Sequence, residues 1–404
     1  MQGCNSGTTY SWDEISTQPI GDLTETVWNL ARYPFGPYDK IGARRLVQNA
    51  TTGTKAVVVY LPPSFTNAKL YPDASLTNYD ENYDFRLYLA NRGYEIFSLD
   101  YRTSFVPSGA QDLSSMATWG NDVFIDDIQS IIEFAKVKTG ASKVFIAGHS
   151  SGGHYVYLYA AERWNDDLSG MIILDSAPWE TDGAPTSLES ISLNEIHAKL
   201  DAGNSEANRA YFQDMGITAD PVTYYNNIVL VFGDGFDEAV RLYYDQGPTY
   251  GPYEGFNTVT DYLADQYQNA WGDAQLTNVE NNYSTVGMLL AFNMTTDSSY
   301  WPLVDYAEET YIGNWDGDTP TGPGYHLREN LGKVDIPIIV FASQMWTDAL
   351  GMNFEWKAMG PTLIKSTDRE YHLLEGFGHL DVLIGEDAKE FVYQPLYDWL
   401  EARR

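Results

Sequence analysis

Apolar runs and helical patterns alternate along two stretches of the chain, residues 43–178 and 331–404. In the first stretch, runs rich in β-branched residues such as TKAVVVYLPPSF are separated by segments whose apolar residues recur every three or four positions, such as NDVFIDDIQSIIEFAKVKTG. The second stretch contains IPIIVFAS, REYHLLEG and a closing helical segment. Strands that alternate with helices of this length predict an α/β fold, with a mostly parallel sheet covered by helices on both faces.

The alternation stops near residue 178. Over residues 181–330 the chain has 23 acidic and 4 basic residues, many aromatic residues and several helical patterns. We interpret residues 179–330 as a largely helical cap or lid inserted into the sheet domain, and residues 1–42 as an N-terminal tether and lead-in.

The charge balance is strongly acidic. The 404 residues include 56 acidic and 24 basic side chains, which gives a net charge of −32. Such a surface repels nucleic acid and anionic lipid, so we exclude nucleic acid as a partner. A solvated exterior suited to salty or extracellular surroundings explains the charge better than attraction of a cationic substrate. No apolar run reaches the length of a membrane span.

The chain has one cysteine, Cys4, so it can form no internal disulfide. The start MQGCNSGTT resembles the processed end of a bacterial lipoprotein, in which Cys4 would carry a lipid anchor outside the cytoplasm. The alternative is a plain N-terminal segment with a chance cysteine.

The segment VFIAGHSSGGHY places the pattern G-x-S-x-G between an apolar strand and a helical segment. A nucleophilic serine at the end of a strand requires a tight, strained turn, and neighbouring backbone leaves no room for side chains beside it. Gly148 and Gly152 meet this need around Ser150, whereas Ser151 has His149 at the corresponding upstream position. We therefore predict Ser150 as the nucleophile; the alternative is a glycine-rich turn without chemistry.

A serine hydroxyl needs a base to become a nucleophile. His379 lies in EGFGHLDVL, after the last predicted strand and ahead of the closing helix. From there an imidazole can reach a serine at the C-terminal edge of a central strand, so we predict His379 as the base. The other five histidines lie in the turn, on the following helix, in the insertion or within a strand pattern: His149, His154, His197, His326 and His372.

The base needs a carboxylate to hold its tautomer. Asp348 follows the strand IPIIVFAS and lies between the serine and the histidine in chain order, which is the order expected of this kind of sheet. We predict Asp348 as the acid. Asp175 and Glu180, after the earlier strand, remain alternatives, and Asp348 could instead cap a helix.

A tetrahedral intermediate also needs two N–H donors for its oxyanion. Ser151, at the start of a helix, is expected to supply one of them. The second should come from the loop after VVVYL, where Pro62 and Pro63 have no N–H, which leaves Ser64 or Phe65.

These motifs resemble those of the α/β-hydrolase family, and its esterases and lipases are the nearest members. The resemblance rests on GHSSG, on YEIFSLDYR, on IPIIVFASQMWTD and on GHLDVL, and it covers residues 43–178 and 331–404. It implies a mostly parallel eight-stranded sheet, a Ser-His-Asp triad and no cofactor.

We expect a serine hydrolase that cleaves carboxylic esters of small molecules or polymers through an acyl-enzyme. The aromatic insertion suggests aromatic or sugar-linked esters, although most of its aromatic residues can equally form the insertion's own core. A serine peptidase or amidase, and a binding protein without activity, remain alternatives. Asp316 and Asp318 have the spacing of two calcium ligands, but a solvated acidic turn is the better interpretation because the closing glutamate is missing.

Overall fold

The computed structural model describes most of the two predicted core stretches and part of the insertion. The described residues are 11–34, 36–49, 53–71, 79–107, 110, 114–178, 236–272, 285–293, 301–302, 305, 327–345 and 355–404. Cys4, Asp316 and Asp318 lie outside them, as do Glu180 and Asp348.

Nine strands of the described part form one sheet in the order β1-β2-β3-β5-β4-β6-β7-β8-β9. The last six strands of this order pair in parallel, and β1 to β3 are antiparallel. The bounds are β1 Asp13–Ile20, β2 Leu23–Ala31, β3 Lys40–Gln48, β4 Val57–Leu61, β5 Glu95–Asp100, β6 Val144–His149, β7 Leu168–Leu174, β8 Ile338–Ser343 and β9 Arg369–Leu374. The predicted parallel sheet is confirmed, with one strand more than the eight that the resemblance implied.

Helices cover both faces of this sheet because its central strands are apolar on both sides. In β4, Val58 and Tyr60 pack into one core with α1 and α15, while Val57 and Val59 pack into a second core with α2 and α3. The helices are α1 Phe85–Ala90, η1 Arg102–Phe105, η2 Ser114–Thr118, α2 Asn121–Thr139, α3 Ser151–Asp167, α7 Phe236–Gln246, α8 Val259–Trp271, α9 Thr285–Asn293, α11 Leu327–Leu331, α13 Glu355–Leu363, α14 Asp381–Ile384, η4 Lys389–Tyr393 and α15 Gln394–Glu401. None of these described helices is long and apolar enough to cross a membrane.

The sheet begins thirty residues before the first strand that the sequence pattern predicted. Strands β1 and β2 form a hairpin with a two-residue turn at Gly21, whose φ is +58°, and β2 pairs with β3. Most of β1 is exposed, and its sequence DEISTQPI has no apolar side to bury. A strand that buries no face carries no apolar alternation, which is why residues 13–20 could be taken for a lead-in.

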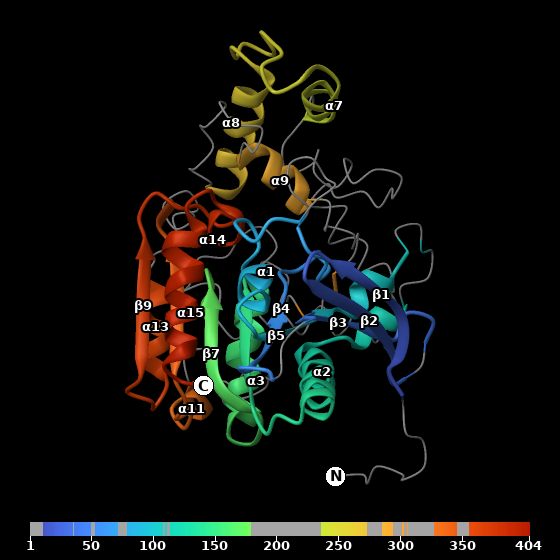
Figure 1. The fold of residues 1–404 in the computed structure, drawn as a ribbon, viewed down its shortest axis with the longest axis vertical. Coiled ribbons are helices and arrows are strands. Elements are labelled where there is room, and N and C mark those ends of the chain that lie inside the picture. Colours follow the sequence, from blue (N-terminus) through green and yellow to red (C-terminus); the bar gives the residue numbers. More distant parts are fainter. Residues whose placement is uncertain are drawn as a thin grey trace.

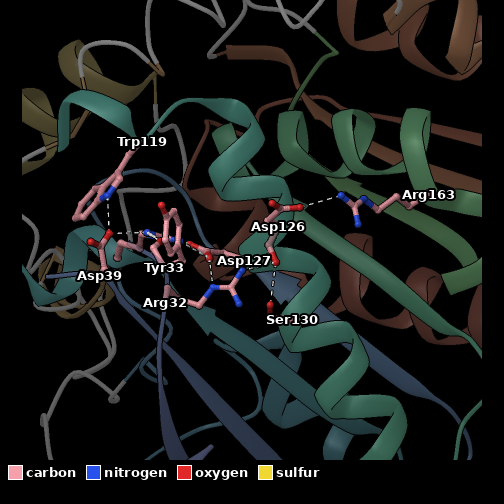
Figure 2. A network of polar contacts seen from close by, with 9 residues as sticks. Arg32, Tyr33, Asp39, Trp119, Asp126, Asp127, Ser130 and Arg163 are labelled. Carbon is pink, nitrogen blue, oxygen red and sulfur yellow. Dashed lines mark hydrogen bonds and ion pairs between the residues drawn. The ribbon is translucent and has the colours of Figure 1, made fainter. Parts of the chain in front are cut away.

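A buried network of charges fixes this hairpin to the body of the fold (Figure 2). The guanidinium of Arg102 lies 2.6 Å from both the Asp39 and the Asp127 carboxylates, and Arg32 Nε lies 2.6 Å from Asp127. Trp119 Nε1 donates to Asp39 at 2.9 Å. Because Asp39 follows β2 and Asp127 lies on α2, the network holds the antiparallel strands against the helix.

The described helices of the insertion lie beyond the end of the sheet at which the parallel strands finish. Figure 1 shows α7, α8 and α9 above the arrowheads of β7 and β9. The ring of Phe292 on α9 lies 5.4 Å from that of Tyr71, which follows β4 in the chain. Trp301 is buried, and its ring centroid lies 5.6 Å from that of Phe65. The insertion therefore packs onto the loop that follows the carboxyl end of β4.

Candidate active site

Ser150 occupies a strained turn between β6 and α3. Its backbone has φ 55° and ψ −129°, a conformation that a non-glycine residue rarely adopts. A Cβ added to Gly148 would lie 2.2 Å from the carbonyl oxygen of Gly152, and a Cβ on Gly152 would lie 2.2 Å from that of Leu61. Both contacts are with backbone, so the two glycines are required by close packing, as the sequence predicted.

Backbone strain is concentrated at the carboxyl ends of the central strands. Four non-glycine residues of the described part have positive φ, and three of them directly or closely follow neighbouring strands: Phe65 after β4, Ser150 after β6 and Asp175 after β7. The fourth is Glu254 in the insertion. Such conformations cost about 1–3 kcal/mol each and cluster at active sites. The carboxyl ends of these strands are therefore the candidate site.

His379 lies at the same end of the strands, in the loop between β9 and α14. The Nε2 atom of His149 lies 3.0 Å from the backbone oxygen of His379, and the centroids of the two rings are 4.4 Å apart. The Gly378 N–H donates to the Asp381 carboxylate at 2.8 Å, which braces the loop. Because His149 directly precedes Ser150, these contacts fix His379 beside the strained turn.

The carboxylate that holds His379 belongs to Asp175. Its Oδ2 lies 2.6 Å from Nδ1 of His379, and both side chains are buried. Asp175 was one of the alternatives that the sequence left open, whereas Asp348, the first choice, lies outside the described residues. The signal for Asp175 is its place directly after β7, the strand that neighbours the one carrying Ser150.

Three further donors hold the Asp175 carboxylate. The N–H and hydroxyl groups of Ser343, at the end of β8, donate to it at 2.6 Å each, and Lys357 Nζ lies 2.6 Å from its Oδ1. Burial by itself would raise the pKa of Asp175, but the Lys357 charge and the hydrogen bond with His379 hold it well below its usual value. Sequence reasoning missed both Ser343 and Lys357.

Burial sets the protonation state of the histidines. Burial lowers the pKa of His379 by more than the neighbouring Asp175 carboxylate raises it, and the Lys357 charge lowers it further. Burial also holds the pKa of His149 well below its usual value. The imidazole of His379 is therefore neutral near pH 7, the state in which it can accept a proton.

The loop after β4 is coupled to the start of α3 by hydrogen bonds to one hydroxyl. Ser151 Oγ accepts from the Ser64 N–H at 2.7 Å and from the Ser64 hydroxyl at 2.6 Å. Of the two residues predicted as the second oxyanion donor, Ser64 therefore has its N–H engaged, and Phe65 is the residue with φ 66°.

The remaining histidines lie outside this arrangement. His154 is buried on α3, and the His372 ring on β9 stacks on Phe341 with a centroid distance of 4.9 Å. His197 and His326 fall outside the described residues. In the described part of the chain, no group of three or more His, Cys, Asp or Glu side chains is placed to bind a metal ion.

A protein-family model described as serine aminopeptidase, S33, matches residues 79–215. That range includes β5, β6, the Ser150 turn and β7. No curated protein sequence matches the chain.

Solved structures of similar fold cover nearly the whole chain. A Sulfolobus solfataricus protein to which a lipase function is ascribed has a TM-score of 0.68 and 23% identity, with 98% of this chain and 99% of that chain covered. A soluble variant of monoglyceride lipase from Saccharomyces cerevisiae, in complex with a substrate analogue, has a TM-score of 0.49 and 15% identity, with 97% and 96% covered. Proline iminopeptidase from Mycobacterium smegmatis has a TM-score of 0.41 and 12% identity, with 97% and 98% covered. The first of these establishes the fold.

Proposed function

We propose that this chain, which has the α/β-hydrolase fold, is a serine hydrolase that cleaves carboxylic esters through Ser150, His379 and Asp175. The observation that carries the proposal is the 2.6 Å contact between His379 Nδ1 and Asp175 Oδ2, next to the strained turn that presents Ser150. An ionised carboxylate only accepts hydrogen bonds, so the proton of the neutral imidazole stays on Nδ1. Nε2 is then the acceptor for the serine proton.

The reaction follows from these roles. Ser150 Oγ attacks the ester carbonyl while His379 Nε2 takes its proton, and the Asp175 carboxylate stabilises the imidazolium that forms. The imidazolium then gives the proton to the leaving alcohol, which leaves an acyl group on Ser150. Water, deprotonated by His379, attacks the acyl-enzyme. The imidazolium then returns the proton to Ser150 Oγ as the bond to the acyl group breaks and the acid is released.

The tetrahedral intermediates need N–H donors at the strained turn. We assign one to the Ser151 N–H, because it lies at the N-terminus of α3, where the helix dipole favours negative charge. We assign the second to Phe65 in the loop after β4, because its φ of 66° is a strained, left-handed conformation of the kind that clusters at active sites.

We propose that the insertion acts as a cap over this site, supported by the place of α7, α8 and α9 beyond the ends of the strands (Figure 1). Several of its described aromatic residues pack on one another. The ring centroids of Tyr253 and Tyr262 are 5.0 Å apart, and those of Phe236 and Tyr267 are 5.7 Å apart. These residues therefore give no support for a preference for aromatic or sugar-linked esters.

A peptidase or amidase is the second candidate, because the matching family model is described as a serine aminopeptidase. Rates measured with p-nitrophenyl acetate and butyrate, and with p-nitroanilides of single amino acids, separate the two functions. We expect hydrolysis of the esters and little of the anilides, and loss of both in Ser150→Ala. Faster cleavage of the anilides would establish the peptidase. Failure to cleave any ester or amide would support a binding protein.

A further inference from the structure

Lys357 is a buried lysine in direct contact with the carboxylate that holds His379. It lies on α13, and its Nζ is 2.6 Å from Asp175 Oδ1 and 3.4 Å from Ser343 Oγ. Its side chain is 7% exposed and that of Asp175 is 0% exposed. Among the lysine ion pairs of the described residues, this is the one in which both side chains are less than a tenth exposed.

Fold stability alone does not account for such a pair. Removing two charges from water costs several kcal/mol per ion, and apolar residues of similar size are often equally stabilising. Lysine is also among the residues least often buried. A lysine kept at this position therefore points to a role in the site.

The contacts divide the Asp175 carboxylate between two functions. Oδ2 binds His379 Nδ1 and the Ser343 hydroxyl, whereas Oδ1 binds Lys357 Nζ and the Ser343 N–H. Lys357 thus holds the oxygen that the histidine does not use, and the carboxylate cannot rotate away from the imidazole without breaking an ion pair.

We propose that Lys357 is a positioning residue: it fixes Asp175 against His379, and its charge extends the activity of the site to lower pH. The inference rests on the proposed function, because it assigns Lys357 a part in activating Ser150. A positive charge behind the carboxylate disfavours a second positive charge on the imidazole. The base therefore stays neutral, and able to accept a proton, at a lower pH than Asp175 alone would allow.

Other groups around His379 differ from Lys357 in sign or in state. His149 on β6 is buried, and burial keeps its pKa well below the usual value, so it adds no charge near pH 7. Tyr371 on β9 is neutral, because burial and Asp175 raise its pKa to about 12. Asp381 on α14 carries a carboxyl group, which accepts a hydrogen bond from the Gly378 N–H at 2.8 Å. Lys357 is thus the buried cation of this group of residues.

The test is the pH dependence of kcat/KM for a p-nitrophenyl ester between about pH 4 and pH 9, which reports the pKa of the free enzyme's base. The variants are Lys357→Met, which keeps the stem but not the charge, and Lys357→Arg, which keeps the charge. Lys365→Met is the control, since that lysine pairs with Asp335 at 2.6 Å on the surface, just after α13.

We expect the acidic limb of the Lys357→Met profile to move up by about one pH unit, and its kcat to fall more than its KM rises. The limb should return to within about 0.3 unit of the wild type in Lys357→Arg and stay there in Lys365→Met. A folded Lys357→Met with an unmoved acidic limb would overturn the inference, as would a Lys357→Arg limb shifted as far as that of Lys357→Met. Covalent labelling of Ser150 by a fluorophosphonate tests the proposed function separately: labelling without a pH shift refutes the role of Lys357 alone.

Discussion

Replacing Asp175 with asparagine tests the catalytic arrangement most severely. The carboxylate accepts hydrogen bonds on both oxygens, but an amide has one oxygen and one NH₂ group. The ammonium of Lys357 can only donate, so the amide oxygen has to face Lys357 and the NH₂ has to face His379. Nδ1 of His379 must then accept, its proton moves to Nε2, and the ring can no longer take the proton of Ser150. We expect kcat/KM to fall by about 10⁴-fold, the loss typical of a wrong tautomer in a triad.

The same substitution removes the charge that pairs with Lys357. Leaving one member of a buried ion pair without its partner costs about 3–5 kcal/mol of unfolding free energy. The double variant Asp175→Asn with Lys357→Met removes both charges, so it should recover much of that stability. The Ser343 N–H still requires the amide oxygen on its side, away from His379, so the activity should stay low. Urea denaturation of the two variants therefore separates loss of fold from loss of the catalytic hydrogen bond.

Asp348→Asn is the matched control, because Asp348 is the acid that we predicted from the sequence. Rates with p-nitrophenyl acetate should stay within about threefold of the wild type in this variant, as for a substitution away from the chemistry. Asp175 is not the acid of the triad if Asp348→Asn loses activity as Asp175→Asn does, or if a folded Asp175→Asn keeps more than about a tenth of the wild-type rate.

Three further predictions concern packing and charge. Gly152→Ala places a Cβ 2.2 Å from the Leu61 carbonyl oxygen. We therefore expect urea denaturation to show a loss of about 1–3 kcal/mol of unfolding free energy, together with loss of ester hydrolysis. An active, fully stable variant would contradict the close packing of the turn. Burial lowers the pKa of His154 from 6.5 to about 4, so the unfolded state binds more protons in this window, and His154 should contribute about 3 kcal/mol to the fall in unfolding free energy as the pH drops through it. Burial lowers the pKa of His149 and of His379 as well, so His154→Leu should reduce the pH dependence without abolishing it. An equal slope in both proteins would exclude a contribution from His154. Arg102→Met leaves the buried carboxylates of Asp39 and Asp127 without the cation that they share. Thermal and urea unfolding should therefore show about 3–5 kcal/mol of destabilisation. A change below about 1 kcal/mol would show that the network of Figure 2 is not needed for stability.

The features that could be predicted from the sequence depend on local rules. A parallel strand buried on both faces is a continuous apolar run, so β4, β6, β7 and β8 could be recognised from their residues. The turn at Ser150 requires glycine on both sides, because a Cβ at either position would lie 2.2 Å from a backbone oxygen. The segment GHSSG shows this requirement in the sequence. The loop that carries His379 was recognisable because it follows the last strand of the sheet.

The features that could not be predicted depend on contacts between distant segments. Either Asp175 or Asp348 could hold the histidine as far as chain order is concerned, and only the three-dimensional contact favours Asp175. Lys357 is 182 residues from Asp175 in the chain, and nothing around it indicates a buried charge. The exposed strand β1 lacks an apolar pattern because its place depends on hydrogen bonds to β2 and not on burial.

The most direct test of the account is to identify the residue that a fluorophosphonate probe modifies, by digestion and peptide mass spectrometry. We predict a single adduct on Ser150, which is absent in Ser150→Ala and forms more slowly in Asp175→Asn, while Ser151→Ala remains labelled. An adduct on Ser151, or labelling that persists in Ser150→Ala, would contradict the assignment of the nucleophile.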